Sequence, residues 1–331
     1  MFCPICHGAT RRFGKNRNGS QRHRCEACQK TFTDEATRPV DRRCLEASKA
    51  ELCLRMLLEG NSIRSTERLT DVHRDTIIAT MVEVGEKCER FLARVVRDVE
   101  AHDVQADEIW GFVGCKQKTA EREGYDDSMG DAWCFVAMER DTKLVLAFHV
   151  DKRTPLATTY FAAKLNDATR GRFQLSTDGF RPYRTAVPLV FGDAIDFAQI
   201  VKTYGNSPEV GTASRYSPGE VTAVHTVVII GNPNDDRVST SHAERQNLSI
   251  RMGVRRMTRL TNAHSKKWEN HKAALALWFA YYNFCRVHTT LTDSTRAEGE
   301  PKRKTTPAMA SGLTDHVWSV AELLDRVNPA A

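Results

Sequence analysis

The chain has 331 residues, of which 41% are hydrophobic and 27% are charged, values typical of a globular protein with a core in at least one domain. Apolar runs such as Val227–Ile230 are too short to span a bilayer, so an integral membrane protein is excluded and no membrane partner is expected. The first residues, Met1–Pro4, have neither the basic start nor the apolar stretch of a secretory signal. We therefore expect a cytoplasmic protein.

The positive charge is concentrated at the start of the chain. The formal net charge is +6, and residues 1–33 carry seven basic side chains against a single acidic one, Glu26, so this segment alone is +6. Such clustering favours a polyphosphate partner over the alternative of a basic surface that serves only solubility.

Two Cys-x2-Cys pairs in this segment predict a structural zinc site. Eighteen residues separate the pairs, which is the loop length of a zinc ribbon, and four thiolates can close a tetrahedral Zn²⁺ site. A ribbon spanning residues 1–35 cannot bury a sufficient core by itself, so we expect zinc to stabilise its fold. Arg22 and Arg24 within it are candidate DNA contacts. The predicted zinc ligands are Cys3, Cys6, Cys25 and Cys28.

Residues 44–98 show the apolar spacing of helices and are predicted to form a small all-α domain. Ser62 is the expected N-cap of a second helix, and a turn at Asp71, a residue type that tolerates the left-handed conformation, leads into a third. Helix, tight turn and helix with polar groups at the start predict a helix-turn-helix, in which Arg74 and Thr76 contact DNA. A plain helical hairpin that acts as a spacer is the alternative.

The pattern changes to α/β over residues 100–290, which predict an RNase H-like domain with a mixed sheet. Three successive strands are expected at 104–113, 132–138 and 144–150. Alternating helices and strands follow at 154–166, 172–177, 182–190 and 197–204, with an inserted strand or hairpin at 221–231. Further helices are predicted at 241–251 and 263–285. Residues 291–331 indicate a charged linker and a short C-terminal helix.

Three carboxylates lie where such a sheet brings oxygen ligands together, as a site for hard cations requires. Asp107 lies on the first strand, Asp178 at the carboxyl end of the fourth, and Glu244 near the start of a later helix. Together they are candidate ligands of two catalytic Mg²⁺ ions, which would clamp the attacking and leaving oxygens of a phosphodiester displacement. Glu108 remains an alternative to Asp107, because a central strand is apolar on both faces and alternation does not separate them.

A basic stretch follows Glu244 and has no acidic residue before Glu269. Arg251 lies seven residues, or two helical turns, after Glu244 and shares its face, where it could hold a DNA phosphate beside the metals. Surface ion pairs on a basic helix face are the alternative. The candidate DNA contacts here are Arg245, Arg251, Arg255 and Arg256.

Over nearly its whole length the chain resembles the bacterial insertion-sequence transposases that join a zinc ribbon and helix-turn-helix to an Asp-Asp-Glu part. It departs from them at Val287, where Pro is common, and in the long 205–240 segment. The segments that carry the resemblance are Gly19–Cys25, Ala106–Gly114, Ser176–Gly179, His242–Asn247, Arg259–Ala263, Lys266–Asn270, Tyr282–His288 and Thr306–Ala310.

This resemblance implies a DNA transposase with Asp107, Asp178 and Glu244 as its catalytic residues. It implies Mg²⁺-dependent cleavage at element ends, with Mn²⁺ as a substitute, and transfer of the 3′-hydroxyl to target DNA. Double-stranded DNA with terminal inverted repeats would be the substrate, bound in the bacterial nucleoid by a homodimer or larger assembly. The alternatives are a non-catalytic DNA-binding regulator and a hydrolytic nuclease without strand transfer.

Overall fold

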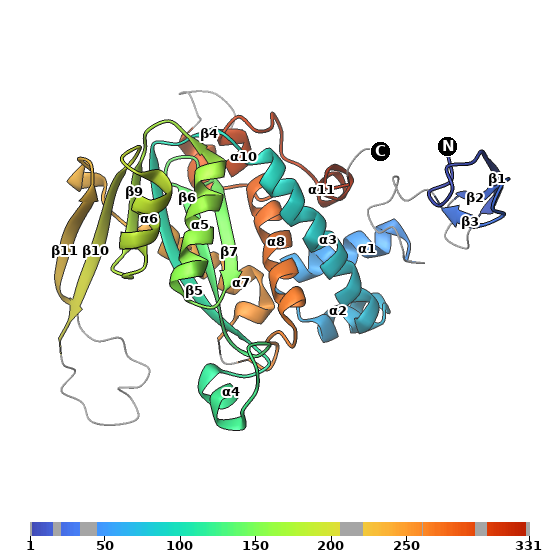
Figure 1. Cartoon of the computed structure of the whole chain (residues 1–331), viewed down its shortest axis with the longest axis horizontal. Coiled ribbons are helices and arrows are strands. Elements are labelled where there is room, and N and C mark those ends of the chain that lie inside the picture. The colour runs from blue at the N-terminus through green and yellow to red at the C-terminus, as the bar shows by residue number, and fades with distance from the viewer. Residues whose placement is uncertain are drawn as a thin grey trace.

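A mixed six-stranded sheet forms the centre of the protein (Figure 1). The computed structural model describes residues 2–15, 21–33, 45–205, 221–259, 261–294 and 303–328. The strands lie in the order β11-β10-β9-β5-β6-β7. Their bounds are β5 Asp103–Val113, β6 Gly130–Glu139, β7 Val145–Asp151, β9 Gln174–Asp178, β10 Asp196–Tyr204 and β11 Val221–Ile230.

Strand directions divide this sheet into two halves. β5, β6 and β7 form an antiparallel meander, whereas β9 runs parallel to β5 and β10 runs parallel to β9. β11 pairs antiparallel with β10 as one long strand, which decides between the strand and the hairpin predicted there. Ala106 lies opposite Thr177, so the next residues along the two strands, Asp107 and Asp178, lie at the same level of the sheet.

Helices cover both faces of the sheet and one of its edges. α5 (Pro155–Ala168) and α6 (Tyr183–Phe191) pack together on one face, and α7 (Ser241–Gly253) packs against β5 and β6. α8 (Trp268–Phe284) lies along β7, where the Asn283 side chain exchanges two hydrogen bonds with the backbone of Val145. These bonds satisfy polar groups at the edge strand.

The start of α8 differs from the prediction. A helix was expected from residue 263, but α8 begins at Trp268. Ser265 instead forms a parallel bridge with Val113, and its carbonyl accepts a hydrogen bond from Gly114 N at 2.8 Å. Pairing with the end of β5 therefore replaces the first turns of the expected helix.

The helices predicted over residues 44–98 are present as α1 (Ala47–Leu58), α2 (Ile63–Thr70) and α3 (Arg74–Val95), and their role as a helix-turn-helix stays a prediction. Ser62 caps α2 by accepting a hydrogen bond from Ser65 N at 3.0 Å, and Asp71 adopts the left-handed conformation with φ 54°. Both local predictions are confirmed.

α3 is long and continues along α8, so α1 and α3 share a hydrophobic core with the sheet, while α2 packs on α1 and α3 (Figure 1). At their closest approach, a Cβ added to Gly85 would lie 2.2 Å from the carbonyl oxygen of Ala273. Only glycine permits helices to pack at this distance.

The C-terminal segment packs on the same core. α9 (Thr289–Ser294) and α10 (Pro307–Ala310) precede α11 (Val320–Arg326), which contacts α1 and α8. Trp318 stacks on Phe284 with ring centroids 4.3 Å apart. The short C-terminal helix is thus present, while residues 295–302 of the predicted linker lie outside the described residues. Within the described ranges, none of the helices has the length and apolarity needed to cross a membrane.

Candidate zinc and catalytic metal sites

The four predicted zinc ligands converge at one end of a small antiparallel sheet. This sheet contains β1 (Thr10–Lys15), β2 (Gln21–Cys25) and β3 (Thr31–Thr33). The sulfur atoms of the four cysteines all lie within 4.8 Å of one another. Cys3 Sγ is 3.6 Å from Cys28 Sγ, and Cys6 Sγ is 3.4 Å from Cys25 Sγ. A zinc tetrahedron with bonds of about 2.3 Å separates its sulfurs by about 3.8 Å, so this cluster of four cysteines fits a Zn²⁺ ion.

Backbone groups of the two turns favour the thiolate form of Cys3 and Cys25, whereas burial and the neighbouring cysteines raise the pKa of the Cys28 thiol to about 11. Ile5 N donates to Cys3 Sγ and Cys28 N donates to Cys25 Sγ, each at 3.4 Å. The hydrogen bond from Cys28 lowers the pKa of the Cys25 thiol. Zinc binds the deprotonated form of cysteine, so the turns prepare the ligands for the metal.

A second cluster of possible metal ligands lies at the junction of β5 and β9. Ligand oxygens of Asp107, Glu108 and Asp178 all lie within 4.8 Å of one another. Two come from neighbouring residues of β5 and the third from the carboxyl end of β9, the parallel strand beside it. Carboxylates this close repel one another unless a cation or a proton lies between them.

Asp107 faces α7, where Asn247 holds it. Asn247 Nδ2 donates to Asp107 Oδ2 at 2.8 Å, and Glu108 N donates to the other carboxylate oxygen at 2.8 Å. Burial, with a smaller contribution from the charges of Asp178 and Glu244, raises the pKa of Asp107 to about 6. Burial and the neighbouring acids thus disfavour the charged form of Asp107.

Glu108 faces the other side of the strand, where Arg153 neutralises it. Arg153 Nη2 lies 2.7 Å from Glu108 Oε2 and 3.8 Å from Asp178 Oδ2. The guanidinium also lies over the rings of Trp133 and Phe180, 4.6 Å and 3.8 Å from their centroids. Burial raises the pKa of Glu108 to about 7, and the charge of Asp178 contributes. Arg153 thus links Glu108 to Asp178 from the face opposite Asn247.

Glu244 lies near these acids but outside their cluster. Its Oε1 accepts hydrogen bonds from Lys202 Nζ at 2.7 Å and Thr240 Oγ1 at 3.1 Å. The first turn of α7 is attached to β5, because Gln105 Oε1 accepts from His242 N at 2.8 Å. The structure therefore brings Asp107 and Asp178 together and leaves Glu244 within electrostatic range, paired with a lysine.

The predicted DNA contacts differ in how far they are free to bind a ligand. Arg22 and Arg24 lie over the ring of Phe13 in the ribbon, and Arg74, Arg245 and Arg255 are exposed, with Thr76 half-buried.

Two of the arginines predicted to contact DNA make hydrogen bonds inside the protein. Arg251 donates to the carbonyls of Met257 and Trp110, at 2.8 Å and 3.3 Å. Arg256 donates to the hydroxyl oxygen of Ser265 and to the carbonyl of Asn270, at 3.3 Å and 2.8 Å. Burial lowers the pKa of both guanidinium groups to about 10. A DNA contact by either stays a prediction, and their internal bonds point to a role in shaping this part of the fold.

Several residues around the acids were not predicted from the sequence: Asn247, Arg153, Lys202 and Gln105. Asn247 could have been found, because it lies three residues after Glu244 and so shares its helix face. No local signal marks the others, whose partners are distant in the chain.

Comparison with known proteins gives a weak structural likeness. No family model and no curated protein matches the chain. Among solved structures, a piggyBac transposase in a synaptic complex with hairpin DNA is similar over 80% of this chain and 68% of that one. Its TM-score is 0.37 and its sequence identity is 10%. A likeness of this degree does not establish a shared function.

Proposed function

We propose that the protein is a DNA transposase that binds the terminal inverted repeats of an insertion sequence and catalyses metal-dependent strand cleavage and strand transfer. The observation that carries the proposal is the convergence of Asp107 and Asp178 from adjacent parallel strands, with Glu244 on the helix packed against them. Oxygen ligands from three separate elements are what a site for hard divalent cations requires.

The sheet supports an RNase H-like assignment of residues 100–290. Three antiparallel strands are followed by two parallel ones, in the order β10-β9-β5-β6-β7. That order sets the carboxyl end of the fourth strand beside the first. The first two acids of an Asp-Asp-Glu site are expected at these positions.

In this proposal each residue around the acids has a definite task. Asp107, Asp178 and Glu244 hold two Mg²⁺ or Mn²⁺ ions, which when bound stabilise the attacking and leaving oxygens of the displacement. Asn247 fixes the orientation of Asp107, and Arg153 holds Asp178 from the opposite face. Glu244 would hold the metal in place of its ion pair with Lys202. Glu108 remains the alternative to Asp107 as first ligand.

DNA recognition is assigned to the preceding parts of the chain. The zinc ribbon of residues 1–35 contributes Arg22 and Arg24, and the helix-turn-helix of residues 44–98 contributes Arg74 and Thr76 at the start of α3. Arg245, exposed next to Glu244, is available for a phosphate of the scissile strand. A homodimer or larger assembly would hold two element ends.

The test is a cleavage and joining assay with purified protein, Mg²⁺ and a duplex that carries the flanking element end. Asp178→Asn keeps the side-chain size but removes the charge that a hard cation needs, so cleavage is abolished while end binding is retained. Asp167→Asn, an exposed position on α5, is the matched control and keeps full activity. Cleavage by Asp178→Asn at the wild-type rate contradicts the proposal.

Two further results of this assay identify the alternatives. Cleavage without joining by the wild-type protein identifies a hydrolytic nuclease. Specific end binding without any cleavage in Mg²⁺ or Mn²⁺ identifies a non-catalytic regulator.

A further inference from the structure

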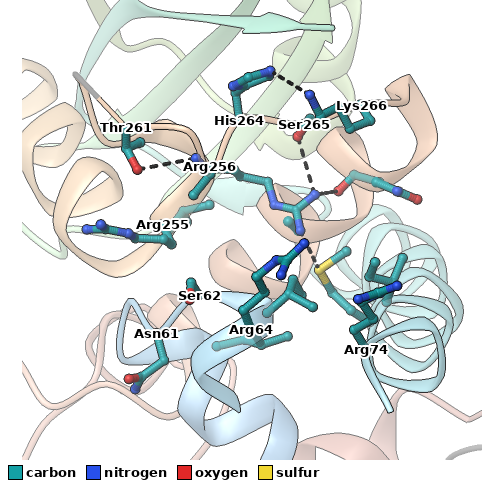
Figure 2. A pocket seen from close by; sticks show the side chains of 18 of the residues that line it. Asn61, Ser62, Arg64, Arg74, Arg255, Arg256, Thr261, His264, Ser265 and Lys266 are labelled. Carbon is teal, nitrogen blue, oxygen red and sulfur yellow. Dashed lines mark hydrogen bonds between the residues drawn. The ribbon is translucent and has the colours of Figure 1, made fainter. Parts of the chain in front are cut away.

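A groove of about 820 Å³ lies between the helix-turn-helix and the segment that follows α7 (Figure 2). The turn before α2 and the first turns of α2 and α3 form one wall, with Arg64 and Arg74. Residues 253–256 and 261–267 form much of the other wall, with Arg255 and Lys266. We call this the basic groove, because its lining contains one acid, Asp75, and six basic side chains: Arg64, Arg74, Arg255, Arg256, Lys266 and Lys267.

Most of these cations are not neutralised by the protein. Arg256 is bound internally and Lys267 lies 3.8 Å from Glu269. In the part of the chain that the structure describes, no carboxylate pairs with the side chains of the other four, and Lys266 contacts only the ring of His264. Unpaired cations on both walls of one groove create a positive field that suits a polyanion.

The basic groove is joined to the acids by α7. A Cβ added to Gly60, in the turn between α1 and α2, would lie 2.5 Å from the carbonyl oxygen of Met252, so the end of α7 touches the helix-turn-helix directly. Glu244 lies nine residues before Gly253, about 14 Å along the helix. Between them, α7 exposes Arg245, Leu248 and Met252 at helical spacing.

We propose that the basic groove binds the phosphate backbone of the DNA duplex that α3 recognises, so that the helix-turn-helix and residues 253–256 and 261–267 grip one duplex together. The proposal rests on the proposed function and adds a second binding wall to it. Because Arg74 and Asp75 in the first turn of α3 line the groove, DNA read by that turn runs past Arg255 and Lys266. From there the exposed face of α7 leads the strand toward the acids.

The experiment measures anisotropy of a fluorescein-labelled duplex of arbitrary sequence with the full chain at several salt concentrations. The full chain is used because α1 and α3 share a core with the sheet. In the Arg255→Gln/Lys266→Gln variant, two phosphate contacts are lost and the salt slope of log affinity falls by about two. At roughly 0.15 M salt the same loss lowers affinity about thirtyfold, or about fivefold per contact.

The matched control removes the same charge at the far end of α3. The control is the Arg94→Gln/Arg97→Gln variant, and Arg94 lies about 30 Å along the helix axis from Arg74. This variant leaves both the salt slope and the duplex affinity nearly unchanged. All four side chains are exposed, and unchanged thermal melting confirms that both variants remain folded.

The outcomes separate this proposal from the proposed function. The groove proposal is overturned if the groove variant keeps the wild-type salt slope and duplex affinity, or if the control variant loses as much of both. Either result overturns it even when Asp178-dependent cleavage is observed. The wild-type protein could instead bind labelled polyglutamate more tightly than the duplex and lose this binding in the groove variant. That result overturns the groove proposal in favour of an acidic protein segment as the ligand. Failure of the wild-type protein to bind any duplex refutes both proposals.

Discussion

Asn247 on α7 donates a hydrogen bond to Asp107 on β5, with 2.8 Å between Nδ2 and Oδ2. The bond joins two elements that are 140 residues apart in the sequence and leaves Asp107 Oδ1 with a single backbone donor. Since Asn247 lies on the same helix as Glu244, it couples the position of the third acid to the first.

Asn247→Ala is expected to lower the rate of DNA cleavage about 10- to 100-fold, the usual cost of removing a group that orients a metal ligand. End binding should stay at the wild-type level, because the exposed arginines are unchanged. Cleavage assays against Mg²⁺ concentration measure the effect, which added Mg²⁺ should partly reverse. Asn166→Ala, exposed on α5, is the control. An unchanged cleavage rate and an unchanged Mg²⁺ dependence would mean that Asn247 contributes only to packing and does not orient Asp107.

The pKa of Asp107 predicts a pH-dependent response to metal. Burial, and then the charges of Asp178 and Glu244, raise this pKa from 3.8 to about 6. Between these values the folded metal-free protein binds more protons than the unfolded chain, so the stability contributed by this group is full below about pH 4 and is lost as pH rises through 6. Above pH 6 the ionised carboxylate destabilises the fold until a cation neutralises it.

Asp107→Asn, which imitates the protonated state, should therefore raise the melting temperature of the metal-free protein at pH 8 and change it little near pH 4. Mg²⁺ should raise the melting temperature of the wild-type protein at pH 8 but not that of the variant. Differential scanning fluorimetry with and without EDTA measures both effects. Equal stabilisation of wild type and variant by Mg²⁺ would remove Asp107 from the ligand set.

Zinc removal should affect the ribbon selectively. Its sulfurs already lie 3.4 to 3.6 Å apart in pairs, and its three short strands offer few buried apolar side chains besides the cysteines. A strong chelator should unfold this segment and release one Zn²⁺ per chain, while the part built on the six-stranded sheet keeps its melting transition. Hydrogen exchange of β1–β3 measures the loss. Slow exchange in a metal-free Cys25→Ala/Cys28→Ala variant would show that the ribbon folds without zinc.

Much of the fold could be predicted because its signals are local. The β-branched and aromatic runs predicted β5, β6 and β7 within a few residues, and Ser62 and Asp71 marked the ends of α2. The start of α8 could not be predicted, because it depends on the pairing of Ser265 with Val113, a distant residue that no local pattern reveals.

The candidate site could also be predicted only in part. The element order predicted that Asp107 and Asp178 meet, since a parallel pairing of two strands follows from the expected sheet. The position of Arg153 between two aromatic rings depends on the packing of three separate segments, and the pairing of Glu244 with Lys202 depends on β10. Such contacts are tertiary and leave no spacing in the sequence.

The contact of α3 with α8 at Gly85 helps to set the position of Arg74, at the start of α3, relative to the acids. Any Cβ at this position meets backbone atoms of Ala273 at 2.2 to 2.7 Å, which cannot move aside as a side chain does. Gly85→Ala must therefore push the two helices apart. Overpacking of this kind costs roughly 1–3 kcal/mol, which exceeds the ~1 kcal/mol that alanine gains over glycine in a helix.

Gly85→Ala should thus lower the free energy of unfolding and, by displacing Arg74 from the acids, reduce cleavage of element ends more than it reduces binding to them. Urea unfolding followed by tryptophan emission, to which Trp278 in the shared core contributes, measures the first effect. Ala93→Gly, at an exposed position of the same helix, calibrates the helix-propensity contribution. If Gly85→Ala instead stabilises the protein by the amount that propensity alone predicts, α3 and α8 are not in backbone contact, and the rigid link between DNA recognition and the acids is absent.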